Sequence, residues 1–144
     1  MDWITDNIAI GNYLDAEDSE LRRASGIRSM ICLNGRLRGV RPEDLDLDAL
    51  ENCDLKDGPG NDPTIFQRAV ESVSGFSSRY AKLLVQCHAG RSRSVVVVAA
   101  HLMLVHRWSA KDALAYVASK RESSVTAGLE KLLRSPFLYD NRTA

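Results

Sequence analysis

The stretch VQCHAGRSRS, residues 85–94, joins two different apolar segments. The run at residues 83–86 is short and hydrophobic, which is typical of a buried strand. The run at residues 93–106 is too long for a strand and is apolar enough to be a helix buried on most sides. The stretch itself contains a thiol, a glycine, two arginines and two serines. The order predicts a strand, a polar loop and a helix.

Strands and helices alternate along the rest of the chain. We expect strands at residues 3–4, 8–10, 27–33, 53–55 and 83–86. We expect helices at residues 42–50, from Pro63 to about residue 80, and at residues 93–106. Three further helices are expected to follow caps: one after Asp15 or Asp18 that ends at residue 24, one after Ser109, and one at residues 127–134 after Thr126. This alternation predicts an α/β domain with a mostly parallel central sheet flanked by helices.

Length and composition exclude several classes of protein. A chain of 144 residues is expected to form one domain. Nineteen basic residues balance nineteen acidic ones, which argues against a nucleic-acid partner. We see no signal peptide and no membrane-spanning run, so we expect a cytoplasmic protein with no membrane partner. Three cysteines at unrelated spacings form neither a disulfide framework nor a zinc pattern. We therefore expect a monomer without metal or cofactor.

The loop after the strand at residues 83–86 has the composition of an anion site. Cys87 lies at the carboxyl end of that strand, where open α/β sheets place their ligands. Backbone N–H groups of the loop can surround an anion, with help from the following helix dipole. The expected phosphate-binding residues are His88, Ala89, Gly90, Arg91, Ser92 and Arg93. Positive surroundings favour the thiolate, which is the nucleophilic form of Cys87. A thiolate inside such a loop predicts attack on phosphorus and a phosphocysteine intermediate.

The leaving group then needs a proton, and a carboxylic acid on a neighbouring loop can supply it. Asp57 stands 30 residues before Cys87, in a loop rich in glycine and proline. One helix and one strand separate the two loops, so both are expected at the same edge of the sheet. Asp54 and Asp62 are alternatives, but Asp62 is also the expected cap of the helix that begins at Pro63.

The segment from Cys87 to Ser94, CHAGRSRS, resembles the signature of the cysteine-dependent protein tyrosine phosphatases: cysteine, five residues, arginine, then serine or threonine. Its Ala-Gly and Ser-Arg-Ser resemble the small atypical dual-specificity branch. NIAIGN at residues 7–12 resembles the opening motif of that branch, and residues 26–34 and 102–121 resemble later elements. The likeness covers nearly the whole chain.

The resemblance implies that residues 1–144 form a dual-specificity phosphatase catalytic domain with a tyrosine-phosphatase-like fold. It implies a hydrolase that removes phosphate from phosphotyrosine and phosphoserine or phosphothreonine in protein substrates. By this resemblance Asp57 is the general acid, Arg93 clamps the phosphoryl group, and the Ser94 hydroxyl eases breakdown of the phosphocysteine. In one departure from the family, Gln86 replaces the histidine that usually precedes the cysteine.

Two alternatives remain at this stage. One is a catalytically weak, phosphate-binding pseudophosphatase. The other is a phosphatase for a non-protein phosphate: a phosphoinositide, an RNA 5′-phosphate or a phosphoglucan. The loop lacks the paired lysines expected of a phosphoinositide site. Arg36, Arg38 and Arg41 fit either a solvated loop or a substrate contact, whereas Cys32, Cys53, His101 and His106 are expected to be structural.

Overall fold

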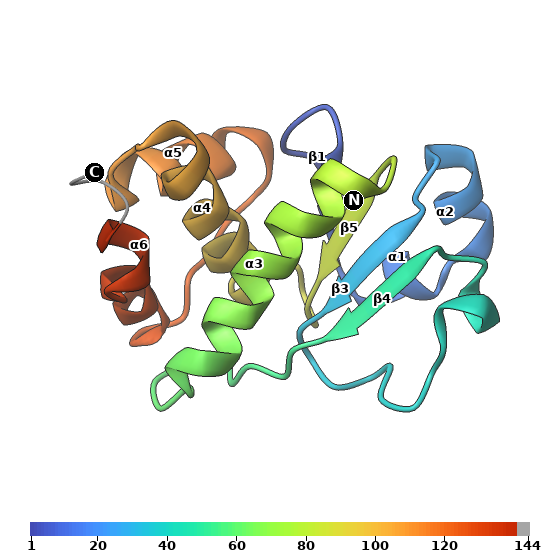
Figure 1. The fold of residues 1–144 in the computed structure, drawn as a ribbon, viewed down its shortest axis with the longest axis horizontal. Helices are drawn as coiled ribbons and strands as arrows, with labels where there is room; N and C mark the ends of the chain where they lie inside the picture. The colour runs from blue at the N-terminus through green and yellow to red at the C-terminus, as the bar shows by residue number, and fades with distance from the viewer. Residues whose placement is uncertain (141–144) are drawn as a thin grey trace.

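A computed structural model describes residues 1–140, and a five-stranded sheet lies at its centre (Figure 1). The strands are β1 (Asp2–Trp3), β2 (Ile8–Gly11), β3 (Ser29–Cys32), β4 (Ala49–Asn52) and β5 (Leu83–Gln86). Their order across the sheet is β1-β2-β5-β3-β4. β5 pairs in parallel with β2 and β3, β4 pairs in parallel with β3, and β1 pairs antiparallel with β2. The expected mostly parallel α/β sheet is therefore confirmed.

Helices cover both faces of the sheet (Figure 1). One face carries α3 (Pro63–Arg79), α4 (Arg93–His106), α5 (Ala110–Lys120), η2 (Leu129–Arg134) and α6 (Phe137–Asp140). The other face carries the shorter α1 (Tyr13–Glu17) and α2 (Ser19–Ser25). Side chains of β5 alternate between the two layers, because Leu83 and Val85 join the first core and Leu84 joins the second.

The valine-rich run at residues 95–98 is helical, as the sequence analysis predicts. Val95 to Ala100 in α4 are all fully buried, so this helix lies inside the larger core rather than on its surface. α4 packs against both α3 and α5. Burial on every side outweighs the strand propensity of valine at these positions.

The prediction for residues 42–55 is wrong in two respects. The expected helix is only a short 3-10 turn, η1 (Pro42–Leu45), which ends at Asp46 in the left-handed conformation. The strand that follows is β4 at Ala49–Asn52, rather than residues 53–55. Pairing with β3 decides the outcome, because Ala49 to Asn52 lie in register with Ser29 to Cys32. No such partner is visible in the local sequence.

Smaller differences occur at both ends. The first strand is Asp2–Trp3 rather than residues 3–4. The expected helix at residues 127–134 begins two residues later, as the 3-10 helix η2, because Gly128 precedes it with a φ of 92°. The sequence analysis does not predict α1, which Asn12 caps, or α6 after Pro136. Asp18, Asp62 and Ser109 do cap helices, as expected.

The parallel strands bring their carboxyl ends to one edge of the sheet, where the arrowheads of β3, β4 and β5 meet in Figure 1. Cys87 follows β5 directly, and Asp57 lies five residues beyond the end of β4. This edge therefore carries the segments that the sequence analysis singles out.

Candidate active site

Cys87 begins the phosphate loop, which we define as residues 87–93. Its side chain is buried, and its Sγ lies 3.2 Å from the Oγ of Ser94, which is also buried. Ser94 lies in the first turn of α4, so the loop closes on itself and brings the hydroxyl beside the thiol. A hydroxyl in this position can donate a hydrogen bond to a sulfur that carries negative charge.

The phosphate loop curls tightly at Gly90. This residue has a φ of 67°, and a Cβ there would lie 2.5 Å from the carbonyl oxygen of Gly11 at the end of β2. Only glycine fits this position without displacing the strand. His88 lies at the rim of the loop, where its ring stacks on Tyr13 at 4.7 Å and its carbonyl accepts from the Tyr13 N–H at 3.1 Å.

Carbonyl groups of the loop point away from its centre. Those of Ala89 and Gly90 accept from the Arg121 guanidinium, and that of Arg91 accepts from the Ser124 N–H at 2.8 Å. In a trans peptide the next N–H points opposite to the carbonyl, so the N–H groups of residues 90–92 face the interior of the loop. Among residues 1–140, no protein acceptor is present for the N–H groups of residues 88–92. The loop can therefore offer several donors to one anion.

Arg93 lies at the end of this array of donors. Its Nη1 donates to the carbonyl oxygen of Leu55 at 3.0 Å, which fixes the guanidinium against the segment after β4. Its Nε is buried and has no hydrogen-bond partner among the described residues. A planar guanidinium anchored at one nitrogen and unpartnered at another suits a phosphate with two oxygens to bind.

Asp57 lies on the acid loop, which we define as residues 56–61. The side chain of Asn61 braces this loop: it accepts from the Lys56 N–H at 2.7 Å and donates to the carbonyls of Lys56 and Gly58 at 2.9 and 3.1 Å. Asp57 itself is exposed and has no partner among residues 1–140. It is two residues beyond Leu55, to which Arg93 binds.

Both alternative acids have structural partners. Asp54 pairs with the guanidinium of Arg38, and Asp62 caps α3 by accepting from the Thr64 N–H at 2.8 Å. These contacts give both carboxylates structural roles, whereas Asp57 has no such partner among residues 1–140. Asp57 is therefore the carboxyl that best fits the role of acid.

The three arginines left open by the sequence are all in ion pairs. Arg36 pairs with Glu17 at 2.9 Å, and its guanidinium also lies over the Tyr13 ring at 4.6 Å. Arg38 pairs with Asp54, as described above. Arg41 lies 3.4 Å from Asp44 and 3.8 Å from Glu43. Arg36 is thus linked to the rim of the phosphate loop through the stack of Tyr13 on His88, and Arg41 belongs to the η1 turn.

Gln86, which stands where the family usually has histidine, supports the loop from β5. It is buried, and its amide nitrogen donates to the Sγ of Cys32 at 2.7 Å and to the Oδ1 of Asn34 at 3.3 Å. The amide thus ties β5 to the end of β3 just before Cys87. Cys53 is buried in the core on the other face of the sheet, among residues of α3 and α4, and burial raises the pKa of its thiol. Cys32 and Cys53 are accordingly structural, as expected.

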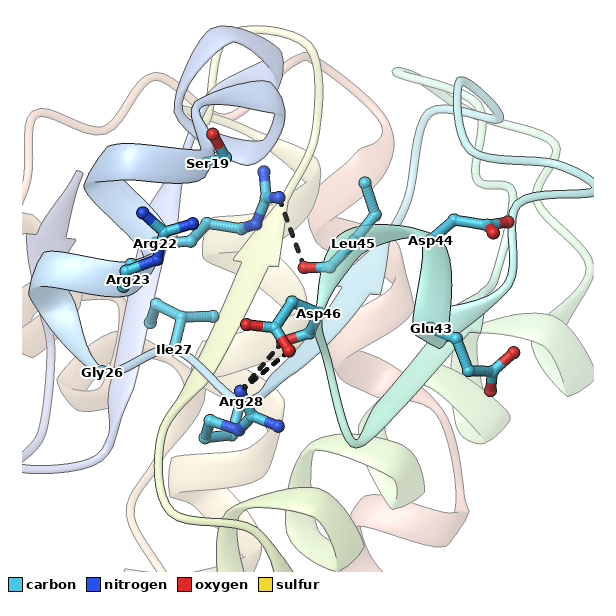
Figure 2. Close-up of a pocket in the computed structure, with 10 residues that line it drawn as sticks. All are labelled: Ser19, Arg22, Arg23, Gly26, Ile27, Arg28, Glu43, Asp44, Leu45 and Asp46. Carbon is cyan, nitrogen blue, oxygen red and sulfur yellow. Dashed lines mark hydrogen bonds and ion pairs between the residues drawn. The ribbon is translucent and has the colours of Figure 1, made fainter.

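A separate cavity of about 300 Å³ lies near the amino ends of β3 and β4, away from Cys87 (Figure 2). Arginines from α2 and the loop after it face η1 across this cavity. Arg22 is buried and donates to the carbonyls of Ala16 and Leu45, and burial lowers its pKa. Arg28 pairs with Asp46 and Asp48. These contacts hold η1 against α2, and this region carries no part of the candidate active site.

Two residues at the site were missed by the sequence analysis. Arg121 follows α5 and holds two carbonyls of the phosphate loop, and Thr126 bonds to Ser92. Neither belongs to a local motif, and more than thirty residues separate each of them from its partner. No signal in the single sequence indicates these contacts.

A comparison with known families identifies the chain. The profile of the dual specificity phosphatase catalytic domain matches residues 54–134, which include both the acid loop and the phosphate loop. The chain belongs to the dual-specificity phosphatase family. Among residues 1–140, no cluster of three or more possible metal ligands is present, and no helix is long and apolar enough to cross a membrane.

Three relatives illustrate the range of this family. Dual specificity protein phosphatase 1 of Arabidopsis thaliana is 26% identical over 91% of this chain, and the chain spans 66% of its length. Human phosphatidylglycerophosphatase and protein-tyrosine phosphatase 1 is 39% identical over 41% of the chain and 30% of its own length. The crystal structure of the human tyrosine phosphatase-like serine/threonine/tyrosine-interacting protein is 28% identical, with a TM-score of 0.78 and 93% of each chain covered. The resemblance in fold therefore extends over almost the whole chain.

Proposed function

We propose that this chain is a cysteine-dependent phosphatase that removes phosphate from phosphotyrosine, phosphoserine and phosphothreonine in proteins. One observation carries the proposal: a buried cysteine and hydroxyl lie 3.2 Å apart at the base of a loop in which the N–H groups of residues 88–92 lack acceptors within the described part of the chain. Residues 1–144 act in this proposal as one catalytic domain and as a monomer. Family membership supports the cysteine-based chemistry.

In the first step, the Cys87 thiolate attacks phosphorus opposite the ester oxygen. An S–P bond forms, and the bond from phosphorus to the ester oxygen breaks. N–H groups of residues 88–93 and the Arg93 guanidinium stabilise the charge on the other phosphate oxygens. Asp57 gives its proton to the departing oxygen, so that an alcohol or a phenol leaves rather than an anion.

In the second step, water attacks the phosphocysteine. Asp57, now a carboxylate, takes a proton from this water, and an O–P bond forms while the S–P bond breaks. The leaving group is the Cys87 thiolate, and the Ser94 hydroxyl stabilises it by donating a hydrogen bond. Inorganic phosphate leaves, and both Cys87 and Asp57 return to their starting protonation states.

The surroundings of the site favour a protein substrate. Arg36, Arg38 and Arg41 each hold a carboxylate, which leaves them less able to bind the extra phosphates of an inositol lipid. A lipid phosphate is the second candidate, because one human relative is named for phosphatidylglycerophosphatase activity. Binding without turnover is the third, since another relative is described as phosphatase-like.

Hydrolysis assays with three substrates separate these candidates. We expect wild-type protein to hydrolyse an aryl phosphate and a phosphopeptide panel faster than phosphatidylglycerophosphate in vesicles. Cys87→Ser should abolish turnover and keep phosphate binding, because the loop donors are mostly backbone groups. Preference for the vesicles would favour the lipid candidate. Phosphopeptide binding without hydrolysis by the wild-type protein would support the pseudophosphatase instead.

A further inference from the structure

The α5–η2 connection, residues 121–128, runs along the outside of the phosphate loop. Arg121 is its first residue, and its guanidinium donates to the carbonyls of Gly90 and Ala89. A third nitrogen of this guanidinium pairs with Asp2 in β1 at 2.9 Å, which fixes its direction. Three residues later, the Ser124 N–H donates to the carbonyl of Arg91. The connection thus holds three successive carbonyls of the phosphate loop.

The next residue of the loop, Ser92, also binds the connection. Its hydroxyl donates to the Oγ1 of Thr126 at 3.1 Å and accepts from the Thr126 N–H at 2.9 Å. Ser92 is buried, so water competes little for this pair of hydrogen bonds. Residues 89–92 are therefore held one after another by a single segment.

The far end of the same connection contacts the acid loop. Gly128 has a φ of 92°, and a Cβ on it would lie 2.9 Å from the Cβ and 3.0 Å from the Cδ of Pro59. The backbone of Gly128 is therefore pressed directly against the proline ring. Pro59 is two residues after Asp57, so this contact lies close to the proposed acid.

Hydrogen bonds brace the acid loop internally. Asn61 ties Lys56 and Gly58 together, so a displacement of Pro59 carries Asp57 with it. A cavity of about 290 Å³ lies between the acid loop and η2. Its lining includes Gly58, Pro59 and Gly60 from the acid loop, and Gly128, Leu132 and Pro136 from the segment that contains η2. Around the contact of Pro59 with Gly128 there is thus space into which the acid loop can shift.

We propose that the α5–η2 connection sets the position of the acid loop relative to the phosphate loop, with Gly128 as the positioning residue for Asp57. This rests on the proposed function, since it assumes that Asp57 protonates the leaving group. The connection fixes the phosphate through residues 89–92 and fixes the acid through Pro59. An enlarged side chain at residue 128 pushes Pro59 away and withdraws Asp57 from the ester oxygen.

The test is the dependence of kcat on the leaving group in Gly128→Ala. We expect a loss of about 10- to 100-fold on phosphoserine peptides, whose leaving group needs a proton, because small misplacements of a catalytic group have effects of that size. The loss on an activated aryl phosphate should be about twofold or less, since that leaving group needs no acid. The inhibition constant of inorganic phosphate should stay unchanged. In an Asp57→Asn background, Gly128→Ala should have no further effect.

Gly39→Ala is the matched control, because Gly39 also has a positive φ, 76°, but a Cβ on it would meet no atom within 4 Å. Gly39→Ala therefore introduces the same kind of backbone strain as Gly128→Ala, but no contact with Pro59. Pro59→Gly is the second variant, should Gly128→Ala unfold; it removes the Cβ and Cδ atoms that face residue 128 and should change kcat in the same leaving-group-dependent way.

The outcomes distinguish the positioning role from the proposed function. If Asp57→Asn shows the leaving-group effect and both Gly128→Ala and Pro59→Gly lack it, the positioning role is wrong and the proposed function stands. If Gly128→Ala slows every substrate equally, or weakens phosphate binding, the residue acts on the phosphate loop and the positioning role is again wrong. If Asp57→Asn itself lacks the effect, the role of the acid and its positioning fail together.

Discussion

The Oγ of Ser94 lies 3.2 Å from the Sγ of Cys87, and both side chains are shielded from solvent. In the proposed mechanism, a hydroxyl at this distance stabilises the thiolate most when the phosphocysteine breaks down. Ser94→Ala should therefore slow the second step by about 10- to 100-fold, which is the rate effect expected from losing one hydrogen bond to a charged group. Rapid-quench measurements with an aryl phosphate should then show a burst of phenol followed by slow turnover. Ser94→Thr should restore turnover, and an equal slowing of the burst itself would contradict this role.

Arg93 and Arg91 should differ sharply in importance. The Arg93 guanidinium is anchored to Leu55, and its Nε has no partner among residues 1–140, whereas Arg91 is exposed and pairs with Glu122 at 3.4 Å. Arg93→Lys should lower kcat/KM by about 10²–10³-fold, nearly as much as Arg93→Ala, because a point charge cannot replace the planar fork. Arg91→Ala should cost about fivefold or less, as for an exposed ion pair. Steady-state kinetics on one phosphopeptide check this, and similar losses at both positions would refute it.

Asp57→Asn should lower kcat on poor leaving groups by about 10²–10⁴-fold and affect an activated aryl phosphate much less. Asp54→Asn and Asp62→Asn are the comparisons, because those carboxylates are engaged by Arg38 and by the α3 cap. If either of them steepened the dependence on leaving-group pKa while Asp57→Asn did not, the acid would have to be reassigned.

His101 should make the fold sensitive to mild acid. It is buried in α4, 2.8 Å from the Ser74 hydroxyl, and burial lowers its pKa to about 4, with a smaller effect of His106. The unfolded chain binds a proton there near pH 6.5. Stability from the neutral ring is therefore complete above pH 6.5 and falls as the pH drops towards 4, by about 3 kcal/mol at most. Urea unfolding of His101→Gln between pH 7 and 4 should show a smaller loss, and His106→Gln should reduce the loss only slightly, because His106 is the lesser cause of the lowered pKa.

The sequence predicts the site better than the connections around it. CHAGRSRS is local, so the position of Cys87 at the end of β5 follows from eight adjacent residues and a hydrophobic strand. The predicted position of β4 is wrong because the bounds of this strand depend on its pairing with β3, some twenty residues away. Arg121 and Thr126 are missed for the same reason, since their roles come from contacts with residues 89–92 over more than thirty residues. The proposal that Asp57 is the acid draws on both the sequence and the structure. Its spacing from Cys87 suggests the role, and the structural partners of Asp54 and Asp62 leave Asp57 as the better candidate.

The order of the sheet also bears on how the chain folds. β1 with β2, and β3 with β4, are neighbours in sequence and in space, but β5 is the last strand of the sheet and lies between β2 and β3. Until residues 83–86 are available, the two halves of the sheet have no shared strand, and the inner edges of β2 and β3 expose unpaired N–H and C=O groups. Such distant pairings slow folding and leave partly folded chains open to aggregation. The strand that places Cys87 at the candidate active site is therefore also the strand that completes the sheet.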